Sequence, residues 1–155
     1  MGKKIITIED IEMDDLHGFY LEDLTVGQTA SYAKTVTEAD VVLFAGVSGD
    51  DNPVHINAEY AEQTMFGQRI VHGMFSAALI SAVLGTRMPG PGAIYIDQQL
   101  KFKAPVHIGD TVTATAKVLE INEERRRVTL ETVCTVKGKV VAAGVATNMV
   151  DRRPV

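Results

Sequence analysis

The sequence has a single cysteine, Cys134, among its 155 residues, and this scarcity excludes several classes of protein. One thiol cannot build an internal disulfide framework or a cysteine-based zinc site, and it fits a reducing compartment. The four histidines show no metal-ligand spacing such as H-E-x-x-H, and neither a G-x-G-x-x-G nor a Walker motif occurs. We therefore expect a protein that works without a metal or a redox cofactor.

Excess basic charge and long apolar runs are also lacking. The formal net charge is −5, whereas nucleic-acid binding needs clustered lysine and arginine. No apolar run reaches the roughly 18 residues of a membrane span. The N-terminal residues soon become acidic and lack the apolar core of a signal peptide. We expect a cytoplasmic protein with neither a nucleic-acid nor a membrane partner.

What the sequence does contain is typical of one folded globular domain. Hydrophobic residues make up 46% and charged residues 23% of the chain. Residues 1–25 are acidic and weakly patterned, and we interpret them as an arm over the domain surface. Residues 26–155 would then form the domain itself.

Local signals in the first half predict a strand and a capped helix. Residues 29–36 alternate between polar and apolar side chains, as a strand does. Thr37 followed by Asp40 resembles a capping box, so a helix should begin there and run to about Ser48. Gly49 suits the left-handed position that ends a helix.

The segment "GMFSAALISAVLG", residues 73–85, differs because it has no charged face. A helix that is apolar on every side must be buried on every side, and this one is too short for a bilayer. A smaller helix should precede it, with Asn57 as its cap and Gly67 as its end.

Four strands follow the apolar helix, over residues 94–102, 110–121, 126–136 and 139–150, and the links between the last three are of hairpin length. Consecutive strands with short links form an antiparallel sheet, and this sheet must cover the helix. The predicted fold class is therefore α+β, with a long buried helix wrapped by a curled antiparallel sheet.

The stretch "SGDDNPVHIN", residues 48–57, places an acid and an imidazole in one short, stiff loop. Pro53 fixes its own φ and pushes Asn52 toward extended geometry. This turn could bring the side chains of Asp50 and His55 together. An acid and an imidazole that share one water molecule suit general acid–base chemistry.

These features together resemble the MaoC-like, (R)-specific enoyl-CoA hydratase family, whose fold is the hotdog fold. The likeness rests on "SGDDNPVH", "FGQRIVHGMFSAALISAVL" and "GPGAIYIDQQLKFKAPVHIGD", and it covers roughly residues 25–150. It implies reversible addition of water to a short trans-2-enoyl-CoA, such as crotonyl-CoA, to give the (R)-3-hydroxyacyl form. It also implies a homodimer with joined sheets, or a larger assembly of such dimers, and the acyl thioester at the subunit boundary.

The resemblance also implies roles for individual residues. Asp50 and His55 correspond to the acid–base dyad and Gly73 to the oxyanion donor, while Asp51 falls at a freely varying position. The resemblance also suggests that four further residues take part in substrate binding: Asn52, His72, Ser81 and Leu84. Each has a structural alternative: Asn52 could only shape the turn, His72 and Ser81 could be ordinary hydrogen-bonded side chains, and Leu84 could be a core residue. The side chains that could meet CoA phosphates, or simply be solvated, are Arg69, Arg87, Lys101 and Lys103.

Three other functions remain open at this point. The same dyad could dehydrate a 3-hydroxyacyl group on acyl carrier protein, and the acidic balance of the chain mildly favours free CoA. A hotdog thioesterase would need a carboxylate on the central helix, and the sequence has none from Gly73 to Leu84. An acyl-CoA-binding module would not need an ionisable pair.

Overall fold

The computed structural model describes residues 16–155, and its main feature is one antiparallel sheet of five strands in the order β1-β3-β4-β5-β2. The strands are β1 (Thr29–Thr35), β2 (Ile94–Phe102), β3 (Thr111–Asn122), β4 (Arg127–Val136) and β5 (Lys139–Met149). All five predicted strands are present, with ends that move by one residue at most. The predicted α+β class is confirmed.

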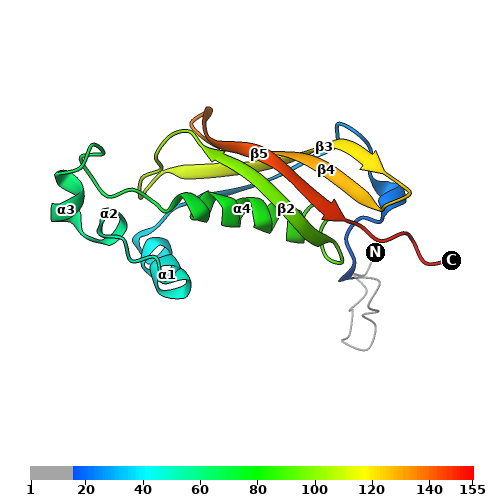
Figure 1. Cartoon of the computed structure of the whole chain (residues 1–155), viewed down its shortest axis with the longest axis horizontal. Helices are drawn as coiled ribbons and strands as arrows, with labels where there is room; N and C mark the ends of the chain where they lie inside the picture. Colours follow the sequence, from blue (N-terminus) through cyan, green and yellow to red (C-terminus); the bar gives the residue numbers. More distant parts are fainter. Residues whose placement is uncertain (1–15) are drawn as a thin grey trace, which may run out of the picture.

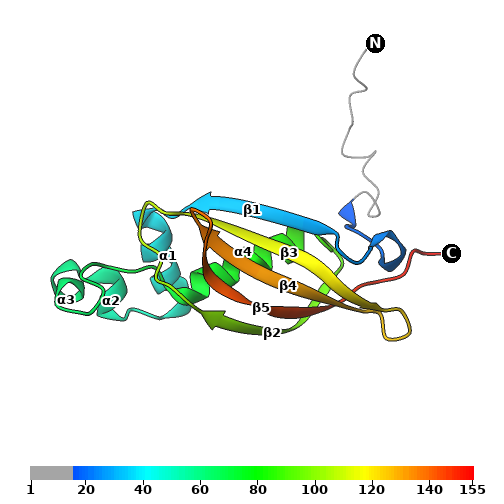
Figure 2. The same cartoon turned by 90° about the horizontal axis from the view of Figure 1, so that it is seen from above.

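The helices lie on one face and at one end of the sheet. They are α1 (Glu38–Ser48), α2 (Pro53–Ile56), α3 (Ala58–Glu62) and α4 (Gly73–Thr86), preceded by a 3-10 helix, η3 (Leu21–Asp23). In Figure 1, α4 runs along the inner face of the sheet, and α1, α2 and α3 project beyond one end. Figure 2 shows the sheet from above, with η3 and the C-terminal tail at the opposite end.

The core forms between α4 and the inward-facing residues of β3 and β4. These residues have no exposed surface: Val112, Ala114, Ala116, Val118, Val128, Leu130, Thr132 and Cys134. They pack against the sheet-facing side of α4, which includes Leu79, Ile80 and Val83. The alternation predicted from the sequence is confirmed in both strands, and burial of this apolar surface stabilises the fold.

The expectation that α4 is buried on every side is wrong for the single chain. Met74, on the side of α4 away from the sheet, is 60% exposed, and Ala78 and Ser81 are exposed beside it. The reason is that five strands curl over one side of the helix without closing around it. An apolar stripe on α4 is thus left uncovered.

The local helix signals are confirmed at α1 and partly wrong at α3. Thr37 and Asp40 form a reciprocal capping box, and Gly49 follows α1 with a φ of 77°. Asn57 caps α3 as predicted, but the helix ends at Glu62, well before Gly67. The Gln63 N–H donates to the carbonyls of Tyr60 and Ala61 and so ends this short helix without a glycine.

Of the predicted arm over residues 1–25, residues 1–15 lie outside the described part of the chain. From there on, Leu21 and Leu24 are buried in the core, and the Leu21 N–H donates to the Asp151 carbonyl. Residues 16–155 include no helix long and apolar enough to cross a membrane.

Candidate active site

The loop and short helices between α1 and α4 carry the dyad residues predicted from the sequence. After Gly49 ends α1, Pro53 forms the first residue of α2, where the absent N–H costs nothing. The Asn52 side chain accepts a hydrogen bond from the Val54 N–H at 3.2 Å and so caps α2. Asn52 therefore shapes the turn that brings Asp50 and His55 together.

Asp50 and His55 face each other across a gap. His55 Nε2 lies 3.9 Å from Asp50 Oδ2, too far for a direct hydrogen bond and close enough for one water molecule to contact both. His55 is 8% exposed, whereas half of the Asp50 side chain is exposed, at 51%. A water molecule from solvent can thus contact the carboxylate and the imidazole at the same time.

A backbone carbonyl sets the tautomer of His55. The Ile70 carbonyl oxygen lies 2.8 Å from His55 Nδ1, and because a carbonyl only accepts, Nδ1 carries the proton. In the neutral ring, the lone pair is then on Nε2 and points toward Asp50. This is the arrangement that a general base requires.

His72 completes a cluster with these two residues. It is 2% exposed, and its Nε2 donates to the Asp50 carbonyl oxygen at 2.8 Å. Its ring stacks on that of His55, with the ring centroids 3.8 Å apart. His72 therefore contacts both members of the dyad.

Gly73 begins α4, so its N–H has no acceptor within the helix and lies at the positive end of the helix dipole. A Cβ at Gly73 would lie only 3.0 Å from ring atoms of Phe102. Glycine lets the Phe102 ring lie this close, and Gly73 itself is exposed. An anion or a carbonyl oxygen can bind an unpaired N–H at the start of such a helix.

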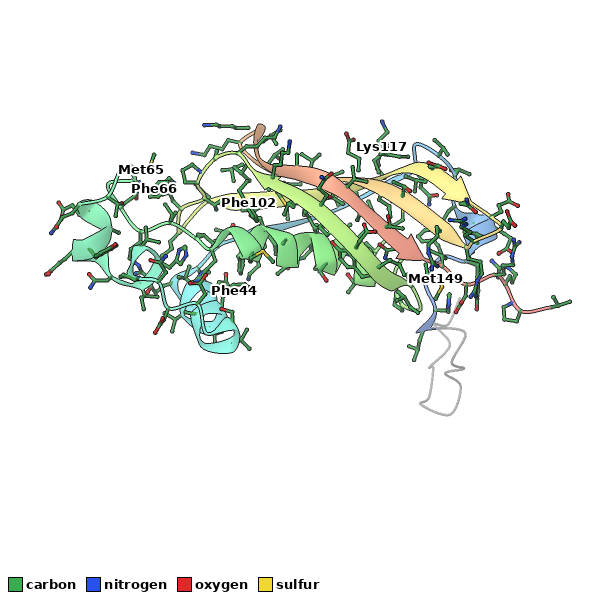
Figure 3. All side chains as sticks on the ribbon, viewed as in Figure 1. Phe44, Met65, Phe66, Phe102, Lys117 and Met149 are labelled. Atoms are coloured by element: carbon green, nitrogen blue, oxygen red, sulfur yellow. The ribbon has the colours of Figure 1, made fainter. Side chains whose placement is uncertain are left out.

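Two cavities meet at Phe102. The first, of about 490 Å³, is lined by His72, Gly73 and Lys103 among others, and the second, of about 550 Å³, by Ser81 and Tyr95 among others. Figure 3 shows Phe102 with Met65 and Phe66 to its left and Phe44 below it. A thioester at Gly73 could extend in both directions from this ring.

The second cavity has a polar wall within an apolar lining. Desolvation, together with the charge of Asp97, raises the pKa of Tyr95, so its hydroxyl stays protonated and donates to Gln98. Gln98 in turn donates to Thr132 Oγ1 at 3.0 Å. Ser81 is exposed into this cavity, while Leu84 is fully buried in the core and lines neither cavity.

The cationic residues considered for CoA phosphates differ in their surroundings. Arg69 Nε donates to the His55 carbonyl at 2.6 Å, and its guanidinium pairs with both carboxylate oxygens of Glu38 at 2.9 and 3.0 Å. Arg69 thus braces the dyad backbone. Lys103 lines the first cavity, and Lys101 and Arg87 are exposed outside both cavities.

One possible ligand atom from each of Asp50, His55 and His72 lies within 4.8 Å of the other two. Each imidazole donates one ring N–H to a backbone carbonyl, that of Ile70 or Asp50, and keeps a lone pair on its other ring nitrogen. Such a lone pair can accept a proton or bind a cation.

A family model described as "MaoC like domain" matches residues 24–142. The chain belongs to the MaoC-like family. The expectation from the sequence motifs is confirmed, and it rests on the blocks around Asp50, His55 and Gly73.

Curated relatives cover nearly the whole MaoC-like chain. It is 61% identical over 140 residues to an (R)-specific enoyl-CoA hydratase of Rhodospirillum rubrum, covering 90% of this chain and 97% of that protein. It is 48% identical over 141 residues to a 3-hydroxybutyryl-CoA dehydratase of Methylorubrum extorquens, covering 91% and 90%.

Solved structures agree with the sequence comparison. The R-hydratase PhaJ1 of Pseudomonas aeruginosa, in its unliganded form, superposes with a TM-score of 0.83 at 44% identity, covering 88% of both chains. The hotdog fold implied by the sequence resemblance is confirmed for this MaoC-like chain.

Sequence reasoning missed three features of this MaoC-like site. They are the Ile70 carbonyl that sets the His55 tautomer, the Arg69 brace, and the Phe102 ring over Gly73. The alternation of Lys101, Phe102 and Lys103 places the two lysines on one face of a strand, but it does not indicate that Phe102 contacts Gly73. No residue pattern could reveal a contact with a backbone carbonyl, since every residue has one.

Proposed function

We propose that this chain is an (R)-specific enoyl-CoA hydratase and, in reverse, a 3-hydroxyacyl-CoA dehydratase. It is a hydro-lyase that adds water to short trans-2-enoyl-CoA, with crotonyl-CoA giving (R)-3-hydroxybutyryl-CoA. The observation that carries the proposal is the free Nε2 of His55 facing Asp50 at 3.9 Å, in a chain 61% identical to a relative of that name.

In the proposed mechanism, one water molecule lies between Asp50 Oδ2 and His55 Nε2. His55 takes a proton from this water as the oxygen bonds to C3, and Asp50 orients the water and stabilises the imidazolium. The electrons of the double bond move onto the thioester oxygen, which the Gly73 N–H stabilises. His55 then returns the proton to C2. Losing a donor of the Gly73 kind costs roughly 3 kcal/mol of transition-state stabilisation.

Coenzyme A enters this proposal as part of the substrate, and the reaction uses no further cofactor because the water supplies both added groups. The two relatives named above act on CoA thioesters by name, which favours CoA over acyl carrier protein. A thioesterase is disfavoured because α4 has no carboxylate to aim at the thioester. Placement in the cytoplasm remains a prediction.

The proposed enzyme is a homodimer or a larger assembly of such dimers. β2 is an edge strand, and it exposes Ile94 and Ile96. Pairing of two copies along β2 would extend the sheet and cover the apolar stripe around Met74 on α4. Sedimentation analysis should give twice the chain mass of 16.8 kDa, or a multiple of that dimer.

The decisive experiment supplies crotonyl-CoA to the purified protein. The ultraviolet band of the enoyl thioester is followed while a thiol-reactive dye reports free CoA. Loss of the band without thiol release, with a product oxidised only by an (R)-specific dehydrogenase, is the expected result. Thiol release would instead indicate a thioesterase, and no change in either signal would direct the test to the same acyl group on acyl carrier protein.

A further inference from the structure

We infer that His72 is a positioning residue that fixes the places of Asp50 and His55 relative to the oxyanion glycine, Gly73. The inference rests on the proposed function and extends it, because it explains how groups from two separate parts of the chain keep a common geometry. His72 does not touch the reacting atoms in this account. It acts through Asp50, His55 and Gly73.

Three connections meet at His72. Its Nε2 donates to the Asp50 carbonyl at 2.8 Å, and its ring stacks on His55 with a centroid separation of 3.8 Å. Its backbone is the N-cap of α4, so the next residue is Gly73. One buried residue thus links the acid, the base and the oxyanion donor.

Asp50 needs such a link because its other contacts are local. Its N–H donates to Ser48 Oγ at 3.1 Å, and its carboxylate accepts from the Asn52 N–H at 3.4 Å. Both partners lie within two residues of Asp50, on the same exposed loop. Within residues 16–155, the hydrogen bond that joins this loop to the start of α4 is the one from His72 Nε2 to the Asp50 carbonyl.

This positioning role depends on which ring nitrogen of His72 carries the proton. Nε2 must carry the proton, because the Asp50 carbonyl can only accept it. His72 Nδ1 is buried and has no hydrogen-bond partner within the described residues 16–155. The ring is also enclosed by Phe44, whose centroid lies 4.9 Å away. In the neutral ring, the one proton of His72 is thus on Nε2 and holds the Asp50 backbone.

Two substitutions separate this role from simple packing. His72→Gln retains an N–H donor near the Nε2 position, whereas His72→Met keeps similar bulk and has no donor. A misplacement of about 1 Å costs about 100-fold in rate, so His72→Met should lose about that factor in kcat for crotonyl-CoA. His72→Gln should recover most of the rate. The loss in His72→Met should fall on kcat more than on KM, because His72 is only 2% exposed and offers the substrate little surface.

Equal losses of kcat in the Gln and Met variants would overturn the inference, as would a normal kcat in His72→Met. Asp51→Asn, on the same loop, serves as the control for nonspecific disturbance. The thermal midpoint of each variant shows whether a loss of rate follows a loss of folding instead. A fall in kcat that tracks the midpoint in both His72 variants would assign His72 to packing.

Nitrogen-15 spectra of the histidine rings give a second readout that does not depend on activity. The expected result is a neutral His72 protonated on Nε2 and a His55 protonated on Nδ1. A His72 ring protonated on Nδ1 but not on Nε2, in an active enzyme, would overturn the inference about His72 and leave the proposed function intact. A protein with the expected tautomers that fails to hydrate any enoyl thioester would overturn the proposed function and, with it, the catalytic role of His72.

Discussion

The sheet with α4 and the segment from Gly49 to His72 are held together by different forces. In the sheet, the inward side chains of β3 and β4 are apolar with few exceptions and have no exposed surface. In the segment, the helices are short, and the buried polar residues are His55 and His72. Each imidazole is tied to a backbone carbonyl, that of Ile70 or Asp50, at 2.8 Å.

This difference separates stability from catalysis. Apolar burial is strong and nondirectional, so it stabilises the fold without defining the position of any one atom. Hydrogen bonds contribute less to stability, but they set distance and angle. Substitutions in the sheet should therefore reduce the free energy of unfolding, and substitutions in the segment should reduce the rate of a protein that stays folded.

The largest expected effect is in the segment, from Asp50→Asn. An amide cannot stabilise the imidazolium of His55, so kcat for crotonyl-CoA should fall about 1,000-fold. The thermal midpoint should stay close to that of the wild type, because half of the Asp50 side chain is exposed. Steady-state kinetics and a melting curve on the same sample test both statements.

Asp51→Asn is the matched control for this change, since Asp51 is the exposed neighbour on the same loop. Its kcat should stay within about threefold of the wild type, as for an ordinary surface substitution. A collapse of kcat in Asp51→Asn, with Asp50→Asn nearly normal, would mean that the dyad assignment has the wrong neighbour.

The corresponding change in the sheet is Leu130→Ala. Leu130 is fully buried against the core, and truncation should cost about 3 kcal/mol of unfolding free energy through lost burial and the cavity left behind. The kcat of the folded protein should remain near normal. Urea unfolding at fixed protein concentration measures the first quantity, and Leu130→Met, which conserves volume, should lose much less.

The Arg69 brace should have an intermediate effect. Arg69→Met removes the hydrogen bond to the His55 carbonyl, which lets the base move, and we expect a loss of about tenfold in kcat. Glu38→Gln weakens the ion pair while leaving that hydrogen bond in place, so its loss should be smaller. If the two variants behave alike and raise KM instead, Arg69 binds the substrate and does not brace the dyad.

The smallest expected effect concerns pH and the core thiol. Burial raises the pKa of Cys134 to about 11, above its value of about 8.5 in an unfolded chain. The folded state thus holds the proton more tightly, and this contribution to stability is complete below pH 8.5 and is lost as the pH rises toward 11. Compared with Cys134→Val, the wild type should lose unfolding free energy between pH 8 and 10, with no such relative change between pH 6 and 8. Urea titrations at those pH values test this.

Much of the fold followed from the sequence because its signals are periodic or local. Alternation in β3 and β4, the Thr37 capping box and the uniformly apolar α4 each reflect a rule that operates within a few residues. The Asp50 and His55 pair also lay within one short motif. Their shared turn, capped by Asn52, is enough to predict that the two side chains lie close together.

Only the tertiary structure decided the rest of the site. The proton position on His55 depends on the Ile70 carbonyl, and the link from His72 to Asp50 spans 22 residues. Phe102, at the end of β2, reaches Gly73 at the start of α4. Such contacts leave no trace in the residue pattern, since the partner is a backbone group or a ring that packing brings into place. The sequence by itself determined which groups the chain carries and which elements bear them, and the tertiary structure decided their orientation, because orientation depends on contacts between distant segments.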